Sequence, residues 1–205
     1  KRFAGLSEDG LSLWYYTDKE TNEEKTTTTY STGDFYLCGD PNPDLYGGFG
    51  TSITFHGFDL STQFSYLVGG LTYDYGYAGM MGNPTATSVG NRWHKDVLKA
   101  WSPENPSSTI PRWHFNDLNT TGSSDRFLID GSYLNLQNIQ VGYTLPDSWT
   151  SHLKIKNLRL YFVCDNVYYW SKRKGLDPRR SISGVGTSGK IAPFRTYSGG
   201  ISLQF

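Results

Sequence analysis

The stretch that decides the fold is Phe194-Arg195-Thr196-Tyr197-Ser198-Gly199-Gly200-Ile201-Ser202-Leu203-Gln204-Phe205. Side chains of an extended strand alternate between two faces. One face would carry Tyr197, Gly199, Ile201, Leu203 and Phe205, and the other would carry small polar residues. The stretch has twelve residues, which would extend over roughly 40 Å at about 3.3 Å per residue. A tilted barrel strand needs only roughly 9 to 11 residues to cross a bilayer. It therefore resembles the last strand of an outer-membrane β-barrel, although the edge strand of a soluble sandwich alternates equally well.

Composition narrows the classes of protein that fit. The chain has 205 residues, formal net charge zero and 19% charged residues, so nothing predicts a nucleic-acid partner. Aromatic residues make up 16% and Gly occurs 23 times, which favours strands and turns over helices. No run of eighteen apolar residues predicts a transmembrane helix, and a mean hydropathy of −0.51 is compatible with half-apolar barrel strands. Because the sequence starts at Lys1 without Met or a signal peptide, we expect a processed protein or a piece of a longer one.

Further alternating stretches repeat the pattern of the final strand. Thr51 to Val68 reads as a hairpin with a tight turn at Gly57, and two more strands cover Asn138 to Leu145 and Asn157 to Asp165. Tyr168, Tyr169 and Trp170 then form an aromatic cluster typical of a membrane interface. The sequence therefore predicts an all-β, antiparallel portion of a transmembrane barrel.

Segment lengths predict which side of a membrane each connection faces. We expect an extracellular loop region over 1–48, a barrel hairpin over 49–77, a long extracellular loop over 78–131 and C-terminal barrel strands over 132–205. The spacing of Trp93, Val97 and Trp101 predicts a short amphipathic helix over Asn91–Trp101 in the long loop. Long segments outside and short turns inside, near Gly57 and 146–153, are typical of outer-membrane barrels.

Several motifs, taken in order, carry a family resemblance. The run from Asp130 to Pro146 reads DGSYLNLQNIQVGYTLP, and it is followed by Asp165-Asn166-Val167, Gly175-Leu176-Asp177-Pro178 and the terminal Phe205. Upstream stand Gly39 to Asp44 and Gly57 to Ser61. Together these motifs are similar to those of SusC/RagA-type TonB-dependent transporters of the bacterial outer membrane.

The resemblance implies an architecture and a set of partners. The chain would supply the last strands of a 22-stranded plugged barrel embedded in outer-membrane lipid. The family imports glycans or peptides, an oligosaccharide or peptide solute being captured with a SusD-like surface lipoprotein. The TonB complex acts through upstream regions that this sequence lacks. The alternating set Tyr197, Gly199, Ile201, Leu203 and Phe205 would be read as an assembly signal.

Two sets of side chains are candidates for contact with the solute. Trp93, Trp101 and Trp113 in the long loop offer flat faces for sugar rings or peptides, although helical spacing also suits packing within the loop. A second set would line a polar lumen and contact either the plug or the solute: Asn138, Gln140, Arg159 and Asp165. A soluble carbohydrate-binding sandwich is the competing interpretation, and it differs in what covers the apolar side chains of the strands.

No motif predicts an enzyme, a metal site or a cofactor. Gly184 to Gly189 matches the dinucleotide fingerprint but lacks the strand before it and the helix after it. His56, His94, His114 and His152 have no metal-ligand spacing on one element. Cys38 and Cys164 stand in dissimilar surroundings, so we expect two unpaired thiols.

Overall fold

The computed structural model describes residues 1–82, 84–85, 92–117, 119, 122–150, 155–172, 177, 179 and 193–205. The chain divides into two compact units. The loop unit comprises Lys1–Pro41 and Leu71–Ile129, and the sheet unit comprises Asn42–Gly70 and the described residues from Asp130 onward. None of the helices among these residues is long and apolar enough to cross a membrane. Gly184 to Gly189 and His152 lie outside the described residues.

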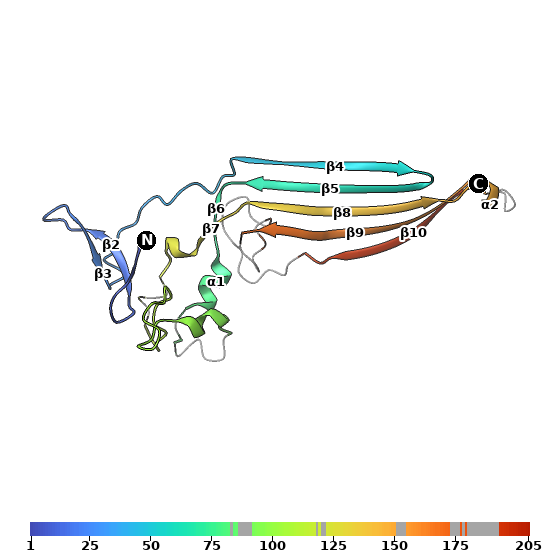
Figure 1. Ribbon diagram of the computed structural model, residues 1–205. Coiled ribbons are helices and arrows are strands. Elements are labelled where there is room, and N and C mark those ends of the chain that lie inside the picture. The colour runs from blue at the N-terminus through green and yellow to red at the C-terminus, as the bar shows by residue number, and fades with distance from the viewer. Residues whose placement is uncertain are drawn as a thin grey trace. The chain divides into compact units, whose positions relative to one another are not determined.

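The sheet unit is one antiparallel sheet of five strands in the order β10-β9-β8-β5-β4 (Figure 1). Its strands are β4 Leu45–Phe55, β5 Phe58–Val68, β8 Tyr133–Thr144, β9 Asn157–Ser171 and β10 Thr196–Gln204. Each has at least the nine residues with which a tilted strand crosses a bilayer. The predicted all-β antiparallel fold is therefore confirmed. Strand β4 begins at Leu45, earlier than the expected hairpin region at 49.

The β4–β5 hairpin closes on two residues, His56 and Gly57. Both have positive φ, 47° and 85°, and Phe55 pairs directly with Phe58. This is the two-residue turn whose twist matches that of the flanking strands. A side chain at Gly57 would also collide with the carbonyl oxygen of Thr144. The tight turn predicted at Gly57 is thus confirmed.

Two adjacent β-bulges interrupt the middle of the sheet. The register of β8 shifts between Leu136 and Asn138 against both of its neighbours. Opposite the shift, Asn166 has a left-handed φ of 52° and donates from Nδ2 to the carbonyl oxygen of Phe194, at 3.0 Å. A bulge re-aims the side chains that follow it. Leu136 and Asn138 consequently point to opposite faces although they are two residues apart.

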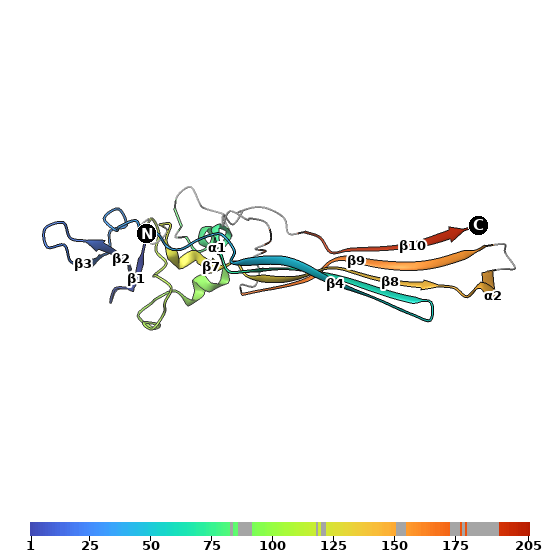
Figure 2. The same ribbon diagram turned by 90° about the horizontal axis from the view of Figure 1, so that it is seen from above.

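Connections at the two ends of the sheet differ in length. At one end lie the His56–Gly57 turn, the short helix α2 Asp147–Thr150 and Phe205, as Figure 2 shows around the C-terminus. At the other end the chain leaves β5 at Val68 and returns at Tyr133, and it leaves β9 at Ser171 and returns at Thr196. The long connections therefore start and end at one end of the sheet, and the short ones at the other.

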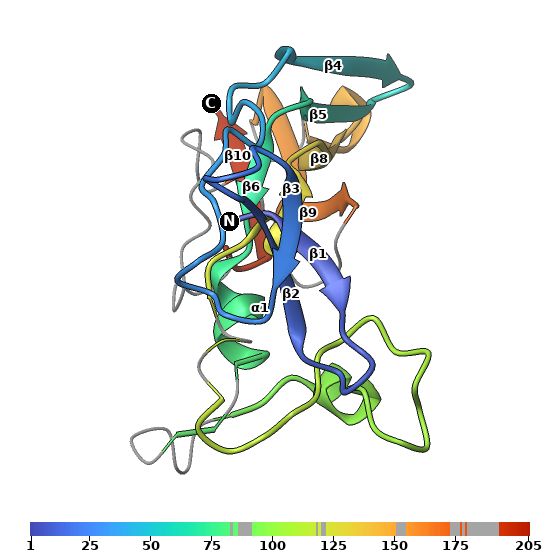
Figure 3. The same ribbon diagram turned by 90° about the vertical axis from the view of Figure 1, so that its left-hand side faces the viewer.

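The loop unit contains two small sheets and short helices. Strands β1 Phe3–Leu6, β2 Ser12–Thr17 and β3 Glu24–Thr27 form one antiparallel sheet (Figure 3). Strands β6 Leu71–Tyr73 and β7 Leu128–Asp130 form the other. Trp14 is completely buried, with Phe3 and Tyr30 edge-on to its ring at 5.7 and 5.1 Å. This aromatic cluster organises the core of the unit.

The helix predicted over Asn91–Trp101 is wrong in extent and type. The structure has a 3-10 helix, η2, only over Lys95–Lys99, while Asn91 lies outside the described residues. His94 ends the preceding extended segment and accepts the Asp96 backbone N–H on Nδ1, at 3.2 Å. That cap starts the helix four residues late, and its last turn ends before Trp101. Elsewhere in its described part, the unit has the helices α1 Tyr75–Met80 and η4 Asp125–Phe127.

Both cysteines carry free thiols, Cys38 exposed and Cys164 buried. The prediction of two unpaired thiols is confirmed.

Candidate functional site

The five-stranded sheet has one apolar and one polar face, fixed by its register. Ile201 pairs with Leu160, which pairs with Tyr143, and Tyr143 pairs with Phe58, so these side chains share a face. Apolar side chains on this face are widely exposed: Ile53 57%, Phe58 57%, Leu160 43%, Phe162 50%, Ile201 66% and Leu203 50%. A soluble sandwich would bury this face against a second sheet. The exposed apolar surface instead suits contact with lipid.

Aromatic residues mark both ends of the apolar face. At the short-turn end, the Phe58 and Tyr143 rings lie 4.4 Å apart, and at the other end Tyr168 and Trp170 lie 4.9 Å apart. On β5, Phe58 and Tyr66 share this face and are separated by roughly 26 Å at 3.3 Å per residue. The apolar band of outer-membrane barrels is about 25 Å tall between its aromatic girdles. A strand tilted by roughly 40° rises about 20 Å over that length, so the two aromatic positions lie within the height of such a band.

The four residues predicted for the lumen all lie on the polar face. Asn138 pairs with Asp165, and its Nδ2 donates to Asp165 Oδ1 at 2.7 Å. Gln140 and Arg159 lie on the same face, nearer the short-turn end. Strand β10 adds only uncharged residues to this face: Thr196, Ser198, Gly200, Ser202 and Gln204. The polar face is thus lined mainly by short polar side chains and carries few charges.

One ion pair between strands crosses a glycine. Arg159 on β9 donates from Nε and Nη2 to the carboxylate of Asp59 on β5, at 2.9 and 2.5 Å. Gly142 on β8 lies between them, and a Cβ there would overlap both charged groups. Bidentate geometry of this kind is specific for arginine. Sequence reasoning identified Arg159 but missed Asp59, because only the pairing register brings the two together.

A second arginine cluster lies at the long-segment end of the polar face. The Arg179 guanidinium donates to both oxygens of Asp177, at 2.8 and 2.7 Å, and to Asn135 Oδ1 at 2.7 Å. Its centre lies 4.8 Å from the centroid of the Tyr169 ring. Sequence reasoning missed this cluster. The only signal was the Gly175-Leu176-Asp177-Pro178 motif, of which Asp177 alone lies within the described residues.

A third ion pair joins the ends of β7 and β9. Lys172 Nζ donates to Asp130 Oδ2 at 2.6 Å, and the Ser132 backbone N–H donates to Asp130 Oδ1 at 2.8 Å. The Lys172 hydrogen bond, helped by those from Ser132, lowers the pKa of Asp130 to about 2. The pair ties the end of β7 to the residue that follows β9.

The structure does not unite the three predicted loop tryptophans. Trp93 and Trp113 meet edge to face at 5.4 Å, and Trp113 Nε1 donates to the carbonyl oxygen of Gly82 at 3.3 Å. Trp113 stays 40% exposed. Trp101 instead packs against Gly10, where an added Cβ would collide with its indole ring. Trp113 thus offers partly open aromatic surface, whereas Trp101 serves the interior of the loop unit.

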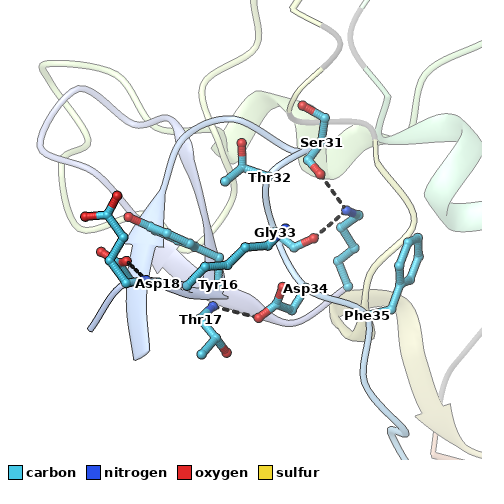
Figure 4. Close-up of a pocket in the computed structure, with 11 residues that line it drawn as sticks. Tyr16, Thr17, Asp18, Ser31, Thr32, Gly33, Asp34 and Phe35 are labelled. Carbon is cyan, nitrogen blue, oxygen red and sulfur yellow. Dashed lines mark hydrogen bonds between the residues drawn. The ribbon is translucent and has the colours of Figure 1, made fainter. Parts of the chain in front are cut away.

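The loop unit also carries an open polar groove of about 750 Å³ (Figure 4). It lies between the end of β2 and the segment 31–35, and Lys1 Nζ donates to the carbonyl oxygens of Ser31 and Gly33 beside it. Near this segment, the Tyr36 hydroxyl donates to Asp125 at 2.5 Å, and burial together with this bond raises the pKa of Tyr36 to about 12. Among the described residues, no group of three or more His, Cys, Asp and Glu could hold a metal ion.

Comparisons with known proteins agree with the sheet geometry. TonB-dependent receptor P3 of Formosa agariphila is 30% identical over 212 residues, which cover 98% of this chain and 20% of the receptor. TonB-dependent receptor SusC of Bacteroides thetaiotaomicron is 27% identical, over 86% of this chain and 17% of the receptor. No family model matches the chain.

Solved structures give the same result for the fold. The RagAB peptide transporter aligns with a TM-score of 0.81 and 25% identity, covering 100% of this chain and 22% of that one. The "open-open" state of the RagAB peptide importer aligns with a TM-score of 0.75 and the same identity. The chain thus spans about a fifth of the length of these relatives. It belongs to the SusC/RagA-type TonB-dependent receptors of the bacterial outer membrane.

Proposed function

We propose that the chain forms the last strands of a 22-stranded plugged barrel that imports oligosaccharides or peptides across the outer membrane. The observation that carries this proposal is the two-faced sheet: its apolar face is exposed between aromatic rows, and its other face is polar. In a barrel the first would face lipid, and the second would face plug and solute. Asn138, Gln140, Arg159 and Asp165 are then lumen residues.

The sorted connections assign sides to the rest of the chain. The regions 1–48 and 78–131 would be extracellular, while 49–77 and 132–205 would supply barrel strands. Trp93, Trp101 and Trp113 belong to the extracellular part, and Trp113 has the most open ring for contact with a solute. The alternating residues Tyr197, Gly199, Ile201, Leu203 and Phe205 would act as the signal for barrel assembly.

Partners follow from the same proposal. A SusD-like surface lipoprotein would cover the extracellular mouth, and the TonB complex would act through parts of the receptor outside this chain. RagAB is described as a peptide transporter, which makes peptides one of the two solute classes to test.

Growth experiments test the function. A strain lacking the receptor should fail to grow on one class of oligosaccharide or peptide as sole carbon source, and the full-length receptor should restore growth. A receptor without its TonB-contacting segment should restore nothing although it reaches the membrane. Restoration by that truncated receptor, or growth of the deletion strain on every solute of both classes, would overturn the proposal.

A further inference from the structure

Arg179, Asp177 and Asn135 form a hydrogen-bonded cluster, here called the clip, which joins residues 177 and 179 to strand β8. All three guanidinium nitrogens donate at 2.7 to 2.8 Å, two of them to Asp177 and one to Asn135. The Arg179 backbone N–H also donates to Asp177 Oδ1, at 3.2 Å. Only 14% of the Arg179 side chain and 6% of the Asp177 side chain are exposed. Opposite charges this buried are stable only when their hydrogen bonds are satisfied, and here they satisfy each other.

The clip sits on the polar face and spans three strands. Asn135 on β8 is 3% exposed, and its Nδ2 donates to Ser65 Oγ on β5 at 3.3 Å. Tyr169, which lies under the guanidinium, pairs directly with Asn135 across β8 and β9. The Asn135 side chain therefore accepts a hydrogen bond from Arg179 through Oδ1 and donates one to Ser65 on β5 through Nδ2. A lysine at position 179 could not reproduce this fork.

Two residues of the clip, Asp177 and Arg179, follow strand β9 closely in the chain. Strand β9 ends at Ser171, and six residues later Asp177 is again against the sheet, on its polar face. Asp177 and Arg179 therefore lie against that face at the long-segment end. We propose that Arg179 is a positioning residue that holds the backbone at Asp177 and Arg179 against the inner wall of the barrel mouth and so limits which solutes pass. This inference rests on the proposed function.

The test uses the full-length receptor with Arg179→Gln and Arg179→Lys. Arg195→Lys is the matched control, since Arg195 precedes β10 at the same end of the sheet and contacts neither Asn135 nor Asp177. Uptake of a labelled solute series of increasing size is measured together with hydrogen exchange of the backbone amides around residue 179. Both Arg179 variants should exchange faster there and should change the apparent KM several-fold for large solutes, with the maximal rate for the smallest solute unchanged. The control should match the wild type in both measurements.

The outcomes separate this inference from the function on which it rests. If the wild-type receptor imports the series and both Arg179 variants keep its KM at every size, the positioning role is wrong. If Arg179→Lys restores wild-type exchange and KM, the fork geometry does not matter and the inference also fails. If the wild type imports none of the solutes, the proposed function fails as well.

Discussion

Glycines at a few positions leave room for the ring or charge of a neighbouring residue. Gly142 admits the Asp59–Arg159 pair, and Gly200 lies beneath the Tyr161 ring on the next strand. An aromatic ring that covers a strand glycine restores packing that the glycine lacks. In the loop unit, Gly10 leaves room for the Trp101 ring and also has a left-handed φ of 73°. These positions therefore tolerate an added side chain poorly.

Gly10→Ala should lower the free energy of unfolding of the loop unit by about 2 kcal/mol, because it combines backbone strain with a collision against the Trp101 ring. Gly79→Ala in helix α1 is the matched control, since a Cβ there has nothing within 4 Å. It should raise stability by about 0.5 kcal/mol through helix propensity. Urea unfolding of the purified receptor, followed by tryptophan fluorescence, measures both. Equal shifts would show that Trp101 does not pack on Gly10.

At the scale of elements, the face of the sheet on which a side chain lies decides how much an added charge destabilises the barrel. Ile201→Lys on β10 would place an ammonium group on the exposed apolar face, whereas Ser198→Lys would place one on the polar face of the same strand. The first should destabilise the barrel by about 2 to 4 kcal/mol near the middle of the membrane, and the second should cost far less. Denaturant titration in lipid vesicles measures the difference. A similar loss for both variants would contradict the assigned faces.

The connection between β7 and β9 should depend on pH through Asp130. Its pKa is lowered to about 2 by the Lys172 hydrogen bond, against about 3.9 for an unfolded Asp. A lowered pKa stabilises the fold above the unfolded value, and that contribution disappears as pH falls from about 4 to about 2. The difference in Tm between the wild type and Asp130→Asn should therefore shrink over this range. Asp9→Asn, at an exposed position, serves as control; a difference that stays constant with pH would refute the role of Asp130.

Periodicity predicted the strands well because alternation is a local property of the sequence. Alternation also groups Asn138, Gln140, Arg159 and Asp165 on one face, since the bulge at Gln137 precedes the first two in β8 and the one at Asn166 follows the last two in β9. It could not predict the partners of these residues, because Asp59 and Arg159 are 100 residues apart. The loop helix failed for a different reason. Tryptophan spacing suggested Asn91–Trp101, but the His94 cap and the packing of Trp101 on Gly10 confine η2 to Lys95–Lys99.

At the scale of the whole molecule, the open edges of the sheet matter most. Strands β10 and β4 each have one neighbour among the described residues, so each presents a row of backbone groups on its other side. Unpaired backbone groups are very costly in lipid, which is why membrane-spanning sheets close into barrels. Since the chain spans 20% of the receptor P3, the remaining strands of such a barrel would come from outside it.

Closure predicts a specific pattern of hydrogen exchange on β10, Thr196–Gln204. In the full-length receptor both alternate sets of its backbone amides should be protected, one by β9 and the other by a strand outside this chain. In the 205-residue chain held in detergent, the set that points away from β9 should exchange rapidly, because no described strand pairs with that edge. Hydrogen–deuterium exchange followed by mass spectrometry compares the two proteins, with β8, which is paired on both sides, as internal control. Rapid exchange of that outer set in the full-length receptor would mean that β10 is a free edge and that the barrel does not close on it.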